Sequence, residues 1–177
     1  MQNLVFTDLS TPRLILTGIS IDDLDFIYTQ FSNEEVNRYL FDAEPVSLLT
    51  DAEEIIRFYL TPEPRNQHRW ILVSKDDGAK LGTCGFHCWD RDLGSCQIGY
   101  DLIPHYWGQG YMNEAVSTLL IYAREEMKVT QIDAIIYPEN VASIRLAEKN
   151  GFVHYGVTSI LNFRGEGYLH KIYSWYP

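Results

Sequence analysis

The sequence predicts a single α+β domain over residues 1–177, with a mixed, mostly antiparallel sheet flanked by helices. Three observations support this fold class. Three strand-like segments follow one another with no helical pattern between them, a later segment repeats apolar residues at helical spacing, and two strand-like segments close the chain. No internal repeat, linker or low-complexity run divides the sequence. Sequential strands combined with separate helices are typical of α+β domains.

The first elements are expected to be one strand and a group of helices. Residues 14–16 are aliphatic strand formers that follow Pro12, which is tolerated at a strand start. Ser20 precedes an acidic stretch that is typical of the first turn of a helix. Residues 50–53 read Thr-Asp-Ala-Glu, a capping box in which the hydroxyl and the glutamate satisfy each other's backbone amides. Two or three helices are therefore expected before a proline-containing loop over residues 61–67.

An antiparallel meander is expected in the middle of the chain. Residues 69–75, 80–89 and 96–103 each have the composition of a strand. The sequence Asp-Asp-Gly at 76–78 is a tight-turn signal between the first two, and residues 90–95 turn the chain again. Because the connections are short, neighbouring strands should pair antiparallel.

The second half of the chain should alternate helices and strands before a final hairpin. Residues 112–127 repeat their apolar side chains at helical spacing, and residues 132–137 form a short apolar run typical of a buried strand. Residues 143–149 are compatible with a helix. Residues 152–159 and 168–175 are then expected to pair as two strands around a glycine-containing turn.

Composition excludes several classes of function. The formal net charge of −10 disfavours a nucleic-acid partner, because a duplex surface rewards lysine and arginine patches. The N-terminal stretch has no leader-like pattern and no apolar run approaches the roughly 20 residues of a membrane span, so a cytoplasmic protein without a membrane partner is expected. A metal site is not expected either. Cys84 and Cys88, with His87 nearby, would lie roughly 13 Å apart on a strand, too far for one ion.

The segment from His105 to Gly110 is the strongest candidate for a binding site. It lies between a predicted strand and a predicted helix, where glycines let successive backbone amides point into one concavity beside the positive end of the helix. A diphosphate would fit such a concavity. A P-loop is excluded because no lysine follows the glycines, and a dinucleotide fingerprint is excluded because Asn113 stands where a third glycine belongs. From spacing alone, an ordinary glycine-rich turn remains the alternative.

Residues 11–175 resemble the GNAT acetyltransferase superfamily, in its branch of ribosomal-protein N-terminal acetyltransferases. Five motifs carry the resemblance: Thr11-Pro12-Arg13-Leu14-Ile15-Leu16, Ile98-Gly99-Tyr100, Tyr106-Trp107-Gly108-Gln109-Gly110-Tyr111, Glu114-Ala115, and the segment from Asn140 through Ser143 to Glu148-Lys149-Asn150-Gly151-Phe152. The resemblance implies a GNAT-like twisted sheet of about six or seven strands, with a V-shaped cofactor cleft between the central strands. It also implies an acetyl-CoA-dependent N-acetyltransferase that uses no metal.

The same resemblance implies where acetyl-CoA binds. The cofactor would lie between the strand that ends at Ile103 and the strand over residues 132–137, with its pantetheine arm held by backbone groups of Leu102 and Ile103. Its pyrophosphate would be held by backbone amides of the turn, namely those of Trp107, Gly108, Gln109, Gly110 and Tyr111. The family pattern has glutamine or arginine where His105 stands. This departure would weaken one phosphate contact and leave the backbone cradle intact.

Two downstream residues are implied to contact the reacting end of the cofactor. Asn140 resembles the asparagine that hydrogen-bonds the cofactor arm, and Ser143 resembles the hydroxyl near its sulfur. Many family members place a tyrosine acid where this chain has Ala147, which leaves Ser143 as the candidate to protonate the departing thiolate. Ordinary helix capping is the alternative for the segment from Asn140 to Ser143.

The mechanism implied by the family is direct attack of a neutral amine on the thioester carbonyl, with no acyl-enzyme. His87, Asp90 and Asp101 are candidates for the base that removes the amine proton, and a structural or surface role is the alternative for each. At pH 7 an α-amine of pKa near 7.8 is roughly 14% neutral, whereas a lysine of pKa near 10.4 is only about 0.04% neutral. The absence of an obvious base therefore favours an acceptor with an N-terminal α-amine.

Two other functions remain open at this point. A small amine such as an antibiotic, a polyamine or an amino-sugar could be the acceptor, and the acidic composition suits a cationic molecule. Alternatively, the departures at His105 and Ala147 would fit a noncatalytic module that only binds acyl-CoA. Homodimers are common among relatives, and the sequence leaves the oligomeric state and the identity of the acceptor open.

Overall fold

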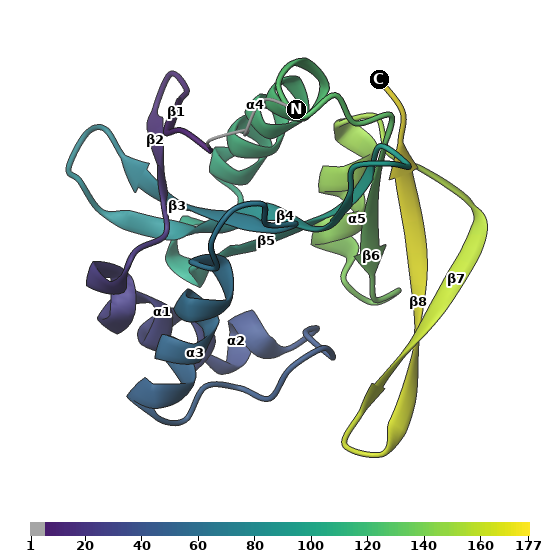
Figure 1. The fold of residues 1–177 in the computed structure, drawn as a ribbon. Helices are drawn as coiled ribbons and strands as arrows, with labels where there is room; N and C mark the ends of the chain where they lie inside the picture. The colour runs from purple at the N-terminus through teal and green to yellow at the C-terminus, as the bar shows by residue number, and fades with distance from the viewer. Residues whose placement is uncertain (1–5) are drawn as a thin grey trace.

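A single eight-stranded sheet runs through the computed structural model, which describes residues 6–177 (Figure 1). Residues 1–5, part of the stretch expected to carry no leader, lie outside the described residues. The strands are β1 (Leu9–Ser10), β2 (Leu14–Gly18), β3 (His68–Ser74), β4 (Lys80–Asp90), β5 (Ser95–Leu102), β6 (Gln131–Ile136), β7 (Val153–Phe163) and β8 (Glu166–Trp175). Their order is β1-β2-β3-β4-β5-β6-β8-β7, and only β5 and β6 are parallel neighbours.

The predicted α+β fold is confirmed, with one strand more than expected. The additional strand is β1, which pairs Leu9 with Leu16 and Ser10 with Ile15 of β2. Two residues are too few to show the alternation of side chains by which strands are recognised in a sequence. The meander over β3, β4 and β5 pairs antiparallel throughout, as predicted.

Helices cover both faces of the sheet (Figure 1). They are α1 (Leu24–Phe31), α2 (Glu34–Asn37), α3 (Leu49–Tyr59), α4 (Tyr111–Glu125) and α5 (Val141–Lys149), with short 3₁₀ turns at Ile21–Asp23 and Pro104–Tyr106. Side chains of β3 alternate between two cores: Trp70 belongs to the core that includes residues of α4 and α5, and Ile71 to the core that includes residues of α1 and α3. Within residues 6–177, no helix combines the length and the apolar character needed to cross a membrane.

The start of α3 differs from the prediction. The helix begins at Leu49, so Thr50 lies inside its first turn and is not the cap. The carboxylate of Asp51 instead accepts hydrogen bonds from the backbone amides of Ser47 and Leu48. An aspartate in the first turn can therefore reach back to the preceding amides without a glutamate, and the predicted capping box was wrong in its residues though right in placing a helix start.

The sheet opens between its two central strands. β5 and β6 pair only over Ser95–Gln97 and Gln131–Asp133. Beyond that point β5 continues against β4 to Leu102, and β6 continues against β8 to Ile136. Since each strand follows a different neighbour and sheets twist, the two strands separate toward their C-terminal ends. This separation confirms the predicted V-shaped cleft between the central strands.

Candidate active site

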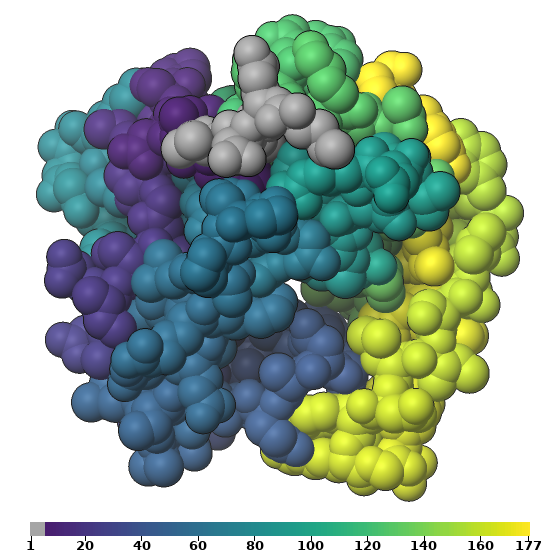
Figure 2. Space-filling model, in the orientation of Figure 1, coloured from purple at the N-terminus to yellow at the C-terminus, as the bar shows by residue number. Residues whose placement is uncertain are grey.

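A cavity of about 1540 Å³ occupies the opening between β5 and β6. Figure 2 shows the molecule hollowed between the hairpin of β7 and β8 and the segment around α2. Pockets for one small ligand usually measure about 300–1,000 Å³, so this cavity has room for two reactants. Nine of the predicted site residues line it: His87, Asp101, Leu102, Trp107, Gly108, Gly110, Tyr111, Asn140 and Ser143. The other four, Asp90, Ile103, His105 and Gln109, do not.

The predicted phosphate-binding turn has the backbone conformation that the glycines suggest. Gly108 and Gly110 have φ values of 72° and 82°, in the left-handed region that favours glycine, and α4 begins at Tyr111. Among residues 6–177, no acceptor is found for the six backbone amides from Gly108 to Asn113. Unsatisfied amides at the first turn of a helix, together with its dipole, form a site for an anion.

An ion pair holds this turn against the edge of the sheet. The Arg13 backbone amide and its Nε donate to the two carboxylate oxygens of Glu114, at 2.7 and 2.8 Å, and Arg13 Nη1 donates to the Gln109 carbonyl at 3.1 Å. The Arg13 guanidinium also lies 4.2 Å from the centre of the Tyr111 ring. Partial burial raises the pKa of Glu114, but hydrogen bonds from Thr11 and Arg13 outweigh it, and the pKa is lowered overall. Two motifs far apart in the sequence thus form one support for the turn.

The predicted pantetheine contacts are only partly available. The Ile103 amide donates to the Leu81 carbonyl, the Ile103 carbonyl accepts from the Tyr106 amide, and Ile103 lies outside the cavity. The structure therefore does not bring Ile103 to the site, because its backbone groups are used in the turn after β5. The Leu102 carbonyl accepts from Trp107 Nε1 at 2.7 Å. Leu102 stays a candidate, since a carbonyl oxygen has a second lone pair.

His105 does not line the cavity, whereas Gln109 remains a candidate through its backbone amide, which has no acceptor within residues 6–177. The exposed His105 contributes its carbonyl to Gln109 Nε2 at 2.9 Å, a bond that stabilises the turn from outside. Neither residue lines the cavity. The departure from the family pattern at His105 therefore changes a position on the outer side of the turn.

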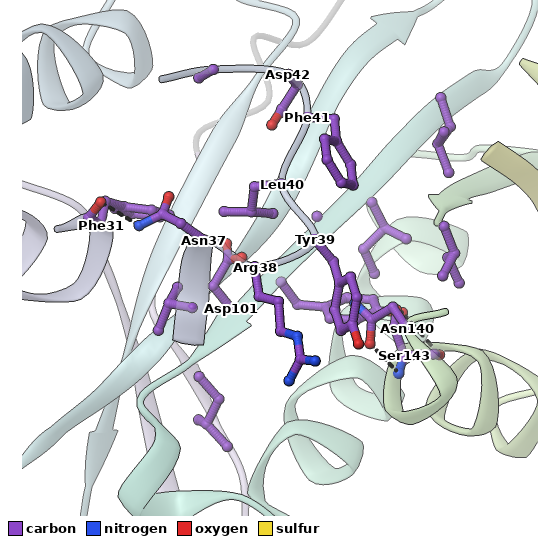
Figure 3. Close-up of a pocket in the computed structure, with 18 of the residues that line it drawn as sticks. Phe31, Asn37, Arg38, Tyr39, Leu40, Phe41, Asp42, Asp101, Asn140 and Ser143 are labelled. Atoms are coloured by element: carbon purple, nitrogen blue, oxygen red, sulfur yellow. Dashed lines mark hydrogen bonds between the residues drawn. The ribbon is translucent and has the colours of Figure 1, made fainter. Parts of the chain in front are cut away.

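At the other side of the V, Asn140 and Ser143 lie together at the start of α5 (Figure 3). Asn140 Oδ1 accepts from the Ser143 amide at 3.1 Å, so the capping alternative for Asn140 is what the structure shows. The Ser143 hydroxyl lies 2.9 Å from the hydroxyl of Tyr100 on β5. Burial raises the pKa of Tyr100 to about 12, although its hydrogen bond with Ser143 lowers it. Tyr100 therefore keeps its proton at neutral pH and can leave the Ser143 hydroxyl free to donate onward.

The three base candidates from the sequence are poorly suited to remove a proton. Burial and the nearby Arg69 guanidinium lower the pKa of His87, which makes it a weak base. Asp101 forms a buried ion pair with Arg69. Asp90 lies outside the cavity, where its carboxylate accepts the Asp92 and Leu93 amides in the turn after β4. The list of candidates from the sequence thus lacks a free, strongly basic group.

Comparison with known proteins decides the family. A family model described as an acetyltransferase (GNAT) domain matches residues 13–153, most of the chain. The chain belongs to the GNAT acetyltransferase family. An uncharacterized N-acetyltransferase of Bacillus subtilis (strain 168), YoaA, is 32% identical over 172 residues, covering 96% of this chain and 97% of YoaA. The predicted resemblance to the GNAT superfamily is confirmed, and the activity of this GNAT protein is acetyl transfer.

Solved structures share the GNAT fold at low sequence identity. RimL, a ribosomal L7/L12 alpha-N-protein acetyltransferase in complex with coenzyme A, superposes with a TM-score of 0.83 at 16% identity, over 94% of this chain and 95% of RimL. Spermidine N-acetyltransferase from Vibrio cholerae, in complex with CoA and spermine, gives a TM-score of 0.77 at 20% identity, over 91% and 92% of the chains. The two proteins differ in acceptor, so the shared fold does not identify the acceptor of this GNAT protein.

Sequence reasoning missed an aromatic wall that lines the cavity. We use the name aromatic wall for Tyr39, Phe41, Tyr137 and His170, which all line the cavity. The Phe41 ring lies 4.7 Å from Tyr137 and 5.7 Å from His170, measured between ring centres. The wall joins a loop after α2 to β8 and to the end of β6, segments far apart in the sequence. No local motif could have revealed it. Within residues 6–177, no group of three or more metal-ligating side chains is found.

Proposed function

We propose that this GNAT protein transfers an acetyl group from acetyl-CoA to the α-amine of a protein or peptide N-terminus. The observation that carries the donor assignment is the row of six free backbone amides at the mouth of the V-shaped cleft. Such a row matches a diphosphate, which accepts several hydrogen bonds at once. The coenzyme A bound in RimL and in the spermidine enzyme supports the same donor.

Different residues would bind the pyrophosphate, the pantetheine arm and the sulfur of acetyl-CoA. The amides of Gly108 to Asn113 would hold the pyrophosphate, and Leu102 and Asn140 would contact the arm between the strands. Acetyl-CoA supplies an activated acetyl group as a thioester. Ser143 would donate its hydroxyl hydrogen to the departing sulfur, and Tyr100, whose hydroxyl lies 2.9 Å from Ser143 Oγ, would then donate to Ser143. The pair therefore supplies the proton that the thiolate needs.

The acceptor is proposed from the chemistry of the bases present. Asp101 is engaged by Arg69, and the pKa of His87 is lowered, so neither group can deprotonate a strongly basic ammonium efficiently. An α-amine with a pKa near 7.8 loses its proton far more readily than a lysine side chain with a pKa near 10.4. An N-terminal α-amine is the amine that this site could use with only a modest base.

One observation favours a second candidate, a small polycationic amine. Glu35, Asp42 and Glu54 line the cavity, and their carboxylates form no hydrogen bond or ion pair within residues 6–177. Unpaired carboxylates attract a cation and raise its local concentration. Spermidine is the acceptor named for the structural neighbour from Vibrio cholerae.

An acceptor screen tests the proposal. Purified protein with acetyl-CoA would be followed by release of free thiol against four acceptors. These are a hexapeptide with a free N-terminal serine, the same peptide blocked at its N-terminus but carrying a lysine, spermidine, and an aminoglycoside. We expect the free N-terminal peptide to give the highest kcat/KM. A higher kcat/KM with spermidine would show that the acceptor is a polyamine and not an N-terminal α-amine. Binding of acetyl-CoA without thiol release on any amine would indicate a noncatalytic module.

Two expectations from the sequence stay predictions. The structure describes one chain, so the homodimer is to be decided by the mass of the protein in solution. The single-domain organisation over residues 1–177 is to be decided by whether unfolding occurs in one cooperative step.

A further inference from the structure

His170 is a buried imidazole to which none of the roles above applies. It lies on β8, only 2% of its surface is exposed, and its Nδ1 is 2.8 Å from the Tyr168 carbonyl oxygen. A carbonyl oxygen can only accept, so Nδ1 must carry the hydrogen. The Nε2 atom of the neutral ring then holds a lone pair, and the backbone fixes this tautomer.

The free nitrogen of His170 has access to the cavity. His170 lines the cavity, and Nε2 has no hydrogen-bond partner in the described part of the chain. Another buried histidine provides a contrast, because Nε2 of His68 is both unpartnered and sealed from any solvent. Nε2 of His170 is not sealed in this way. It is thus an unpartnered hydrogen-bond acceptor on a residue that lines a space large enough for a substrate.

The surroundings of His170 suit an ammonium group in the same cavity that Ser143 lines. Its ring centre lies 5.5 Å from that of Tyr137 and 5.7 Å from that of Phe41. Aromatic faces attract cations and contribute about 0.5–2 kcal/mol to holding one. The Tyr137 carbonyl accepts from the Asn140 amide at 2.9 Å, and Asn140 in turn contacts Ser143. Tyr137 thus contacts His170 through its ring and the start of α5 through its backbone carbonyl.

We propose that His170 Nε2 accepts the proton that the acceptor ammonium loses before it attacks the thioester, with Phe41 and Tyr137 holding that ammonium. This inference rests on the proposed acetyl transfer. The nitrogen freed of its proton forms the C–N bond as the C–S bond breaks. Its second proton passes to the sulfur through the Ser143 hydroxyl, and His170 then returns its own proton to solvent. The products are the amide and free coenzyme A thiol.

Geometry distinguishes His170 from the other cavity histidine. His87 lies beside the Arg69 guanidinium, which opposes a second positive charge, and burial lowers its pKa further. His170 contacts the rings of Phe41 and Tyr137, and its Nδ1–H donates to the Tyr168 carbonyl. Of the two residues, His170 is the one whose tautomer the backbone fixes so that Nε2 can accept a hydrogen.

The test compares His170→Gln and His170→Ala with the wild-type protein, using whichever acceptor of the screen gives the highest turnover. We expect kcat to fall about 100-fold in both variants, the usual cost of losing a general base, with acetyl-CoA affinity within twofold of wild type. Added imidazole should restore turnover of the alanine variant, because removal of the ring leaves a space that opens into the cavity. The much weaker base pyrazole should not restore it.

His154→Gln is the matched control. His154 also bonds a backbone carbonyl through Nδ1, to Ile172 at 2.9 Å, but it does not line the cavity, so its replacement should leave kcat unchanged. Wild-type kcat in His170→Gln, or a loss in the alanine variant that imidazole does not restore, would overturn the proposal. A wild-type protein that releases no thiol with any amine would instead overturn the proposed function, and donor binding would be measured separately by calorimetry.

Discussion

The two sides of the cavity are built in different ways. The proposed donor side is a stretch of backbone that is continuous in the sequence, in which Gly108 and Gly110 set the conformation and the turn and the first residues of α4 supply the amides. The proposed acceptor side is an assembly of side chains from a loop, from the end of β6 and from β8. A backbone site tolerates most side-chain changes but not a change in conformation. A side-chain site can change its ligand through single substitutions, which explains how one fold serves different amines.

The largest effect is expected from Gly110→Val, because this substitution disturbs the backbone conformation on which the proposed donor side depends. A Cβ at this position would lie 3.5 Å from Arg13 Nη2, and valine is strained at a φ of 82°. If the displaced turn loses two hydrogen bonds to the pyrophosphate at about 1.5 kcal/mol each, acetyl-CoA affinity falls roughly 100-fold. Calorimetric titration would measure it.

Gly78→Val is the matched control for that change. Gly78 has a φ of 73° and open space around it, and it lies in the turn between β3 and β4. The substitution should carry similar strain and leave donor affinity unchanged. If the Gly110 variant binds acetyl-CoA as tightly as the wild type, the turn does not belong to the donor site.

The next effect concerns Tyr100 and Ser143, whose hydroxyl groups connect β5 to α5 across the cleft. Tyr100→Phe and Ser143→Ala should each lower kcat about 10-fold, the value of one hydrogen bond of roughly 1.4 kcal/mol, with little change in acetyl-CoA affinity. Because the two hydroxyls act as one relay, the double variant should be no slower than the slower single variant. Pre-steady-state thiol release would measure the rates. If the kcat losses of the two single variants instead multiply in the double variant, the two hydroxyl groups act independently.

A smaller effect is expected from Phe41→Ala on the acceptor side. The ring contacts Tyr137 and His170 and lines the cavity, so its loss should raise the acceptor KM about fivefold, or roughly 1 kcal/mol, and leave donor affinity unchanged. Phe163→Ala is the control, since Phe163 contacts Phe41 but does not line the cavity. A change in donor affinity with Phe41→Ala would contradict the separation of the two sides.

The smallest effect is a pH dependence of stability that comes from Glu114. Its folded pKa is lowered by Thr11 and Arg13, so its contribution to stability is fully present above its ordinary pKa of 4.5 and is lost as the pH falls through the lowered value. Glu114→Gln should lower Tm by about 3 °C at pH 7, the effect of roughly one hydrogen bond in a chain of this size. Thermal melts at pH 7 and pH 3 would test this, and a difference that persists at pH 3 would point to packing.

The same contrast explains what the sequence could reveal. The order of strands and helices and the turn from Trp107 to Tyr111 were predictable, because periodicity and glycine spacing are local properties. Ile103 and His105 were placed at the site by resemblance, yet the hydrogen bonds after β5 direct them elsewhere. Phe41 and His170 were missed because they are far apart in the sequence and come into contact only in the folded protein. Tyr100 lay within a recognised motif, but its contact with Ser143 is a tertiary one.

The three-residue seam between β5 and β6 also has a consequence for how the molecule resists unfolding. In the part of the chain that the structure describes, residues 6–177, strands β1 to β5 and strands β6 to β8 pair with each other only through Ser95–Gln97 and Gln131–Asp133. A ligand that contacts both flanks of the opening therefore adds contacts that hold the two halves of the sheet together. At a concentration 100 times its Kd, it would add about 2.7 kcal/mol to the free energy of unfolding. Amide hydrogens along the seam should then exchange more slowly with solvent deuterium, so protection of Gln131–Asp133 reports donor occupancy without any acceptor present.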